Sequence, residues 1–156
     1  MSDIIDELKE EHTKLLDYFG TLNDVSSSNV ELCKSFMIIK DFLLNHIHKE
    51  DRLIYPLLNA EAKVDSELRH QIDQHDQELM NLASIIESFS QKYCDSGLAS
   101  NSAMNELDFI IQLLGVRISN EEDFIFQRYE ALAKKSSVGY FTVKPPPPPQ
   151  QISTQR

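Results

Sequence analysis

The sequence predicts an all-α fold, an up-down-up-down antiparallel four-helix bundle. Apolar residues recur at alternating intervals of three and four along four long segments, which places them on one face of each helix. The chain of 156 residues has only four glycines, and five of its six prolines stand together at 145–149, so few residues interrupt these helices. Short connections between the segments favour antiparallel neighbours.

The first helix is expected at residues 3–22, and the second from the end of Ser26-Ser27-Ser28-Asn29 to about residue 60. Serine and asparagine accept hydrogen bonds from the free N–H groups at a helix start, so this tetrapeptide marks an N-terminus. A bend is expected near Pro56. The buried positions of the first helix are predicted to be Ile5, Leu8, His12, Leu15, Phe19 and Leu22. Those of the second are predicted to be Leu32, Phe36, Ile39, Leu43, His46, Glu50, Leu53 and Leu57.

The third helix is expected at residues 64–93, where Asp95-Ser96-Gly97 ends it, and the fourth at 102–133. The buried positions of the third are predicted to be Leu68, Ile72, His75, Leu79, Leu82, Ile86, Phe89 and Tyr93. Those of the fourth are predicted to be Leu107, Ile110, Leu114, Arg117, Glu121 and Phe124.

The domain organisation follows from these segments. Residues 1–135 are expected to form the bundle, and residues 136–156 a flexible, proline-rich C-terminal tail. The beginning of the tail, with Tyr140 and Phe141, could fold back on the bundle. The stretch Lys144–Arg156 is read either as a plain extended terminus or as a docking peptide for a protein partner with a proline-reading domain.

Charge and composition exclude several function classes. The formal net charge of −10 argues against nucleic acid and anionic membranes as partners. The N-terminal residues lack the basic and apolar regions of a signal peptide, and no apolar run is long enough to span a bilayer. Cys33 and Cys94 are too few for a disulfide scaffold, so a reduced, cytoplasmic protein is the expectation.

Every predicted helix carries polar, ligand-type residues among its buried positions. An unpaired carboxylate is costly in a protein core, so these groups need compensation. Counting residues from the turns brings them to about the same layer of the bundle. The residues are His12, His46, Glu50, His75, Arg117 and Glu121.

Three imidazoles and two carboxylates in one layer indicate a metal site, with iron favoured and manganese or zinc as alternatives. Two other kinds of site fit less well. A Ser-His-Asp arrangement lacks a serine among the buried positions. A ferritin-like site needs two Glu-x-x-His pairs, and the chain has one, Glu67 with His70.

The order of these residues resembles the hemerythrin-like (HHE cation-binding) family over about residues 3–133. The matching features are His12, the run His46 to Glu50 followed by Leu-Ile-Tyr-Pro, the lone His75, and Glu121. The resemblance implies a non-haem iron centre bridged by two carboxylates. It also implies dioxygen or nitric oxide as small ligands, and roles in oxygen or redox sensing or in iron and nitric oxide stress.

The chain departs from the family pattern at Arg117, where the family has a histidine, and at Gln71, where some members have another. The guanidinium could replace one metal, because one divalent ion, two carboxylates and Arg117 carry a net charge of +1. One or two ions are therefore open, as is an atrophied site whose histidines satisfy each other. In the single-metal arrangement Arg117 is expected to bridge Glu50 and Glu121.

A second resemblance supports the metal-free reading. The pattern Arg-x-x-x-Glu-Glu in the fourth helix, together with His-x-x-x-Glu in the second, is similar to a bacterial regulator family that binds the housekeeping sigma factor. Such a protein is a helical bundle that acts through its surface. The two function classes are thus a metal-binding protein that senses or handles oxygen, nitric oxide or iron, and a metal-free regulator. Neither is an enzyme acting on an organic substrate.

The remaining histidines, acidic residues, cysteines and aromatic residues are expected to have structural rather than functional roles. The helical angle places His48 and His70 on the surface. Glu11 and Glu122 are expected on solvated faces. Cys33 and Cys94 come to the same end of the bundle, but a disulfide between them is not the expectation. Three aromatic residues are assigned to the core rather than to redox chemistry: Tyr55, Phe124 and Phe126.

Overall fold

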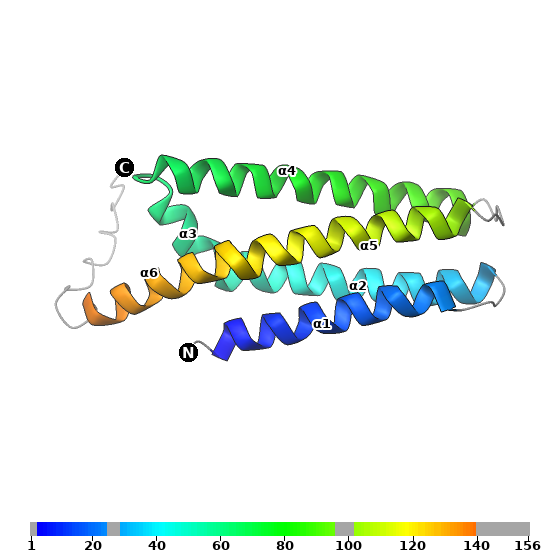
Figure 1. Cartoon of the computed structure of the whole chain (residues 1–156), viewed down its shortest axis with the longest axis horizontal. Coiled ribbons are helices and arrows are strands. Elements are labelled where there is room, and N and C mark those ends of the chain that lie inside the picture. Colours follow the sequence, from blue (N-terminus) through cyan, green and yellow to red (C-terminus); the bar gives the residue numbers. More distant parts are fainter. Residues whose placement is uncertain (1–2, 25–28, 96–101, 140–156) are drawn as a thin grey trace, which may run out of the picture.

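The computed structural model describes residues 3–24, 29–95 and 102–139, and these residues form a helical bundle without strands. Its four rods are α1 (Asp3–Asp24), α2 (Asn29–Leu53), α4 (Ser66–Phe89) and α5 (Ser102–Asn120). Figure 1 shows α1 lying along α2 and α4 along α5, with all four rods close to the long axis of the molecule. Because α1 also packs against α5, the two pairs enclose one core. The predicted all-α bundle is confirmed.

The second rod breaks where a bend was expected, and the break changes which residues are buried. α2 ends at Leu53, and the short helix α3 (Tyr55–Glu61) starts after Ile54 with proline in its first turn. Proline has no N–H to continue the ladder of α2 and disfavours helix in the residue before it. The predicted burial of Leu53 is therefore wrong: it is 41% exposed, and Ile54 and Leu58 face the core instead.

Two π-helical segments extend the other rods. α4 begins after Asp65, whose side chain accepts a hydrogen bond from the Leu68 N–H at 3.0 Å, and continues as η1 (Ser90–Asp95). α5 continues through η2 (Glu121–Ile125) into α6 (Phe126–Gly139). A π-turn holds more residues than an α-turn and so moves the buried face along the sequence. Phe124, predicted to be buried, is consequently half-buried, and Ile125 and Phe126 are buried.

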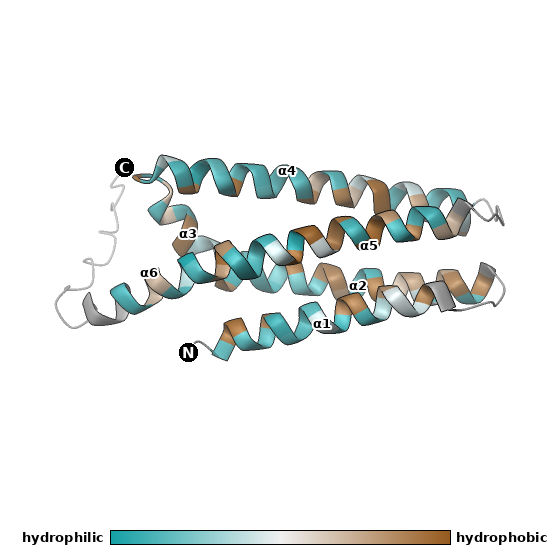
Figure 2. Cartoon of the chain, viewed as in Figure 1, coloured by the Kyte–Doolittle hydropathy of each residue, from teal (hydrophilic) through white to brown (hydrophobic). Residues whose placement is uncertain are grey.

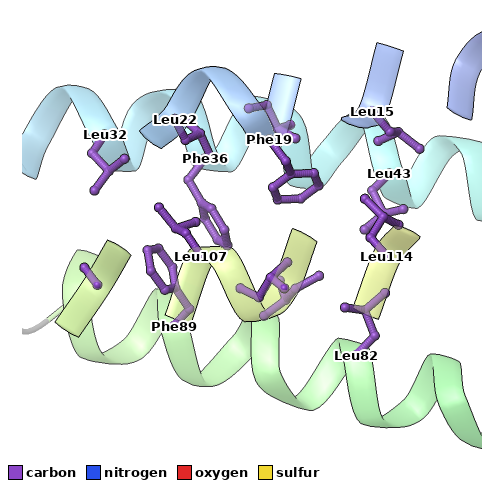
Figure 3. Packing of buried hydrophobic residues seen from close by; sticks show 14 of the residues in the cluster. Leu15, Phe19, Leu22, Leu32, Phe36, Leu43, Leu82, Phe89, Leu107 and Leu114 are labelled. Carbon is purple, nitrogen blue, oxygen red and sulfur yellow. The ribbon is translucent and has the colours of Figure 1, made fainter. Parts of the chain in front are cut away.

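Apolar side chains fill the bundle in two clusters, one toward each end. In Figure 2 apolar residues recur along α1 and α5 between hydrophilic ones, whereas the visible face of α4 is mostly hydrophilic. Figure 3 shows the larger cluster, in which side chains from all four rods point toward one another. Its members include Leu15, Phe19, Phe36, Leu43, Leu82, Phe89, Leu107 and Leu114. The smaller cluster lies around α3 and α6 and includes Ile5, Leu8, Ile54, Leu58, Ile72, Ile125 and Phe126.

A buried polar layer separates the two apolar clusters. On α1, for example, His12 stands between Leu8 of the smaller cluster and Leu15 of the larger one. On each of the other long helices, the polar residues likewise lie between residues of the smaller cluster and residues of the larger one. These residues are His12, His46, Glu50, His75, Arg117 and Glu121, each at most 5% exposed. The fold therefore holds six ionisable or charged groups in one section of its core.

Cys33 and Cys94 form a disulfide that joins α2 to η1. The expectation of two reduced thiols is wrong. Antiparallel packing brings the start of α2 beside η1, and the Cα atoms of the two cysteines lie 5.5 Å apart. Sequence spacing placed both cysteines at the same end of the bundle, but their separation depends on how α2 and η1 pack.

The helix α6 runs to Gly139, beyond the expected domain boundary at residue 135. The predicted tail from residue 140 onward, including Tyr140 and Phe141, lies outside the described residues. Within the described ranges, no helix combines the length and the apolar character that crossing a bilayer requires.

Candidate metal centre

Four buried side chains from three rods converge on one point of the polar layer. They are His12 from α1, His46 and Glu50 from α2, and Glu121 from η2, and one ligand atom of each lies within 4.8 Å of the others. Two ligands on opposite sides of a metal ion are about 4.2 Å apart, given metal–ligand lengths of about 2.1 Å. The four donor atoms thus come close to the spacing of a mononuclear coordination set, and small side-chain movements would bring them to it.

Local helical geometry explains how these side chains meet. His46 and Glu50 are four residues apart on α2, so they project from the same face one turn apart. Glu121 is the first residue of the π-helix η2, and π-turns inside α-helices often occur at functional sites. The ring of His12 lies 4.7 Å from that of His46 and stacks on Phe126 at 5.4 Å between centroids.

Each buried histidine lies between two carboxylates. His12 has Glu122 3.3 Å from Nδ1 and Glu121 3.6 Å from Nε2. His46 has Glu11 2.7 Å from Nδ1 and Glu50 against Nε2. His75 has Glu78 4.0 Å from Nδ1 and Glu121 3.3 Å from Nε2. In all three, the Nε2 atom is the one that faces the centre.

A neutral imidazole has one N–H, so none of these histidines can donate to both of its carboxylates. With the proton on Nδ1 and the carboxyl group ionised, the Nε2 lone pair faces a carboxylate oxygen, which is repulsive without a cation or a proton between them. Several of these central atoms have no hydrogen-bond partner within the described chain. They are Nε2 of His12, His46 and His75, both carboxylate oxygens of Glu50, and Oε2 of Glu121.

The outer carboxylates hold the histidine rings in this orientation. Burial would raise the pKa of Glu11, but hydrogen bonds from Lys49 and His46 lower it below its ordinary value. Glu11 therefore stays an anion and can accept a hydrogen bond from Nδ1–H of His46, which leaves Nε2 free to bind a metal. A carboxylate behind a ligating histidine fixes its tautomer and increases its basicity.

Arg117 and His75 occupy the other side of Glu121. The Nε of Arg117 lies 3.1 Å from Oε1 of Glu121, and its Nη1 donates to the His75 carbonyl at 3.0 Å. The predicted bridge from Arg117 to both carboxylates is wrong: of the two, the guanidinium pairs with Glu121 alone. Since Arg117 and His75 both take Oε1, the Oε2 atom of Glu121 is left for the four-residue cluster.

The two central carboxyl groups differ in proton affinity. Burial raises the pKa of Glu50 well above its ordinary value, and the nearby charge of Glu121 raises it further. Burial acts on Glu121 in the same direction, but its close neighbours His12, His75 and Glu50 and the charge of Arg117 bring its pKa well below that value. Of the two carboxyl groups, Glu50 therefore has the higher affinity for a proton.

Residues 3–129 of the chain match the model of the hemerythrin HHE cation-binding domain. The chain belongs to this family. No curated protein and no solved structure matches the chain. A hemerythrin domain implies a metal-binding site with buried histidine and glutamate ligands, and the unpartnered atoms of the central cluster fit such a metal.

The structure brings together most of the residues that sequence patterns suggested for the metal site of this hemerythrin domain. His12, His46, Glu50 and Glu121 form the cluster, while His75 lies beyond Glu121 beside Arg117. Gln71, at the other substituted position, is half-buried, and its Oε1 has no hydrogen-bond partner among the described residues.

Of the remaining predictions, those for the surface histidines are confirmed and those for two glutamates are wrong. His48 and His70 are exposed, as predicted. Glu11 and Glu122 are not simply solvated, because each faces the Nδ1 atom of a central histidine. Glu78 has the same position behind His75. These contacts join different helices in two of the three cases, so helical periodicity could not reveal them.

Proposed function

We propose that this hemerythrin domain binds one divalent metal ion, iron by preference, through His12, His46, Glu50 and Glu121. The observation that supports the proposal is the placement of each central histidine between an outer and an inner carboxylate. This arrangement prepares an imidazole nitrogen for a cation and is unfavourable without one. Two imidazole nitrogens and two carboxylate oxygens suit iron, and less selectively manganese or zinc.

Arg117 supports a stoichiometry of one. The guanidinium holds the outer oxygen of Glu121 and supplies a positive charge where a second ion would otherwise be needed. Together with one divalent ion and two carboxylates it gives the site a net charge of +1. Among the described residues, the central nitrogen ligand on that side is His75, whose Nε2 already faces Glu121, and one such ligand is too few for tight binding of a second ion.

We further propose that the protein senses or handles oxygen, nitric oxide or iron. Four protein donors leave iron at least one coordination position for a small ligand. Iron bound in this layer would supply reversible binding of a diatomic molecule or a change of redox state. The protein contributes an apolar cluster on each side of the layer, which restricts the site to small ligands.

The test is metal analysis of matched histidine variants. Protein from iron-supplemented cells should contain about one metal ion per chain. His46→Ala should lose the metal, because it removes a ligand. His48→Ala is the control, since His48 lies two residues away on the same helix but is exposed, and it should retain the metal.

Two results would contradict the proposal. One is a parent protein that stays metal-free after reconstitution with iron, manganese or zinc and melts at the same temperature in chelator. That outcome would favour the metal-free, protein-binding regulator. The other is equal metal content in His46→Ala and the parent, which would place the metal elsewhere.

A further inference from the structure

The solvent-facing side of α2 carries large apolar side chains that the bundle does not bury. Ile38 is 71% exposed, Val30 is 62% exposed and Met37 is 42% exposed. The core residues of the same stretch, Leu32 and Phe36, lie on the other side of the helix. Apolar side chains that gather on one exposed face mark an interaction surface, because water solvates them poorly.

Ile38 stands between two hollows of the surface and borders both. The hollow between α2 and η1 has a volume of about 580 Å³ and also contacts Val30, Met37 and the disulfide. The hollow between α1 and α2 has a volume of about 360 Å³ and also contacts Phe42. A water molecule occupies about 30 Å³ of liquid, so each hollow can accept a large side chain. A ridge flanked by grooves is the shape that one helix surface offers to another.

Two charged residues lie on the same side of α2 as the apolar group. Lys34 and Asp41 are seven residues apart, almost two helical turns, so their side chains project in the same direction. Both are exposed, and within the described part of the chain neither forms an ion pair. We call Val30, Lys34, Met37, Ile38 and Asp41 the α2 face. It has no net charge, although the whole chain has a formal net charge of −10.

The order of residues on the α2 face fits a second copy of the same face. In a two-fold symmetric pair of antiparallel helices, residues equally far on either side of the axis lie opposite each other. Lys34 and Asp41 lie equally far from the midpoint between Met37 and Ile38, about 5 Å along the helix in each direction. An axis at that midpoint places Lys34 of each copy opposite the partner's Asp41. Opposite charges therefore meet twice, and Ile38 of each copy meets the grooved surface of the other.

We propose that the α2 face pairs with the α2 face of a second copy, so that the protein forms an antiparallel, two-fold symmetric dimer. Self-repulsion of the acidic chain is smallest where the contact surface is neutral. One helix face with its flanking hollows is a small interface, and interfaces below about 1,200 Å² belong to weak complexes. The dimer should therefore have a dissociation constant on the order of micromolar. The proposal does not depend on the metal site.

Sedimentation velocity of the full chain, at concentrations from about 1 to about 300 µM, tests the dimer. The parent should shift from monomer to dimer over this range. Ile38→Glu places a charge beside the symmetry axis in both copies and should weaken the dimer by at least about 100-fold, because like charges then face each other in an apolar contact. Met80→Glu is the control, since Met80 is 66% exposed on α4. It should dimerise like the parent.

A charge swap tests the register of the two helices. Lys34→Asp or Asp41→Lys alone brings like charges opposite each other twice and should weaken the dimer about 10-fold or more. The double variant Lys34→Asp with Asp41→Lys restores opposite charges and should dimerise like the parent. All of these positions are exposed, so each variant should remain folded by circular dichroism.

Three results would overturn the proposal. The first is a dimer that persists in Ile38→Glu, and the second is a charge-swapped double variant that is as weak as the single ones. The third is a parent that stays monomeric throughout the concentration range. If deletion of residues 140–156 then produced a dimer, the occupant of the α2 face would be the chain's own C-terminal segment.

Discussion

Replacing Glu50 with glutamine should have opposite effects on the metal-free and the metal-loaded protein. Glu50 is 1% exposed, and burial together with the charge of Glu121 raises its pKa, so without a metal it keeps a proton to higher pH than an exposed carboxyl group does. A glutamine has the same shape, needs no proton, and can donate its amide N–H to Glu121. With a metal bound, the same change removes one of four ligands.

The magnitudes follow from linkage. A metal at 100 times its dissociation constant stabilises the folded state by about 2.7 kcal/mol. For a chain of this size that corresponds to a rise in melting temperature of roughly 5–10 °C, which Glu50→Gln should lose. In chelator, the carboxyl of Glu50 has a higher pKa in the folded than in the unfolded state, so the folded protein binds the extra proton. The metal-free parent should therefore lose stability as the pH rises from 4.5, the ordinary pKa, toward the raised value.

The assay is thermal unfolding by circular dichroism between pH 5 and 8, with chelator and with ferrous iron under anaerobic conditions. In chelator the parent should lose up to about 1.4 kcal/mol per pH unit over this window, whereas Glu50→Gln should lack that decline and be the more stable protein at pH 8. Glu31→Gln, an exposed change at the start of the same helix, is the control. If Glu50→Gln destabilised the protein equally with and without metal, Glu50 would serve as a permanent anion, and the reasoning would be refuted.

Three further predictions test the surroundings of the site. Arg117→His should admit a second iron, because it supplies an imidazole near His75 and frees Glu121, and air-exposed protein should then show new near-ultraviolet absorption. Unchanged iron content and absorption in a folded variant would contradict this. Deletion of Lys144–Arg156 should leave iron content and melting temperature unchanged, because a proline- and glutamine-rich segment cannot bury an apolar face. A large loss of stability in the truncated protein would show that the segment is structural. Loss of a co-purifying partner, with the fold intact, would support docking. Cys33→Ser should lower stability by about 4 kcal/mol at most, the loop-closure value for cysteines 61 residues apart, and a reductant should bring the parent to the same level. Equal stability of the variant and the oxidised parent would argue against the disulfide.

Much of the fold could be predicted from sequence because helical periodicity reports burial directly. The apolar positions recur at alternating intervals of three and four residues, and this pattern placed His12, His46 and Glu50 inside the bundle. All three are buried. The prediction failed where the helix geometry changes. Past Glu50, the break before Pro56 shifted the buried face to Ile54.

The site was predictable in its ligands but not in its supporting contacts. Periodicity identifies which residues face the core, yet it does not give the relative shift of two helices along their axes. The contacts of Glu11 with His46, and of Glu122 with His12, depend on that shift. The commitment of Arg117 to Glu121 rather than to both carboxylates depends in addition on the π-helix that begins at Glu121.

The central claim is that this hemerythrin domain holds one metal ion between His12, His46, Glu50 and Glu121. The most direct test is anomalous X-ray diffraction at the iron absorption edge from crystals of iron-loaded protein. The account predicts a single anomalous peak within coordination distance of the two histidine Nε2 atoms and both carboxylates, and none beside Arg117. A second peak between His75 and Arg117, or no peak in the polar layer of iron-loaded crystals, would contradict it.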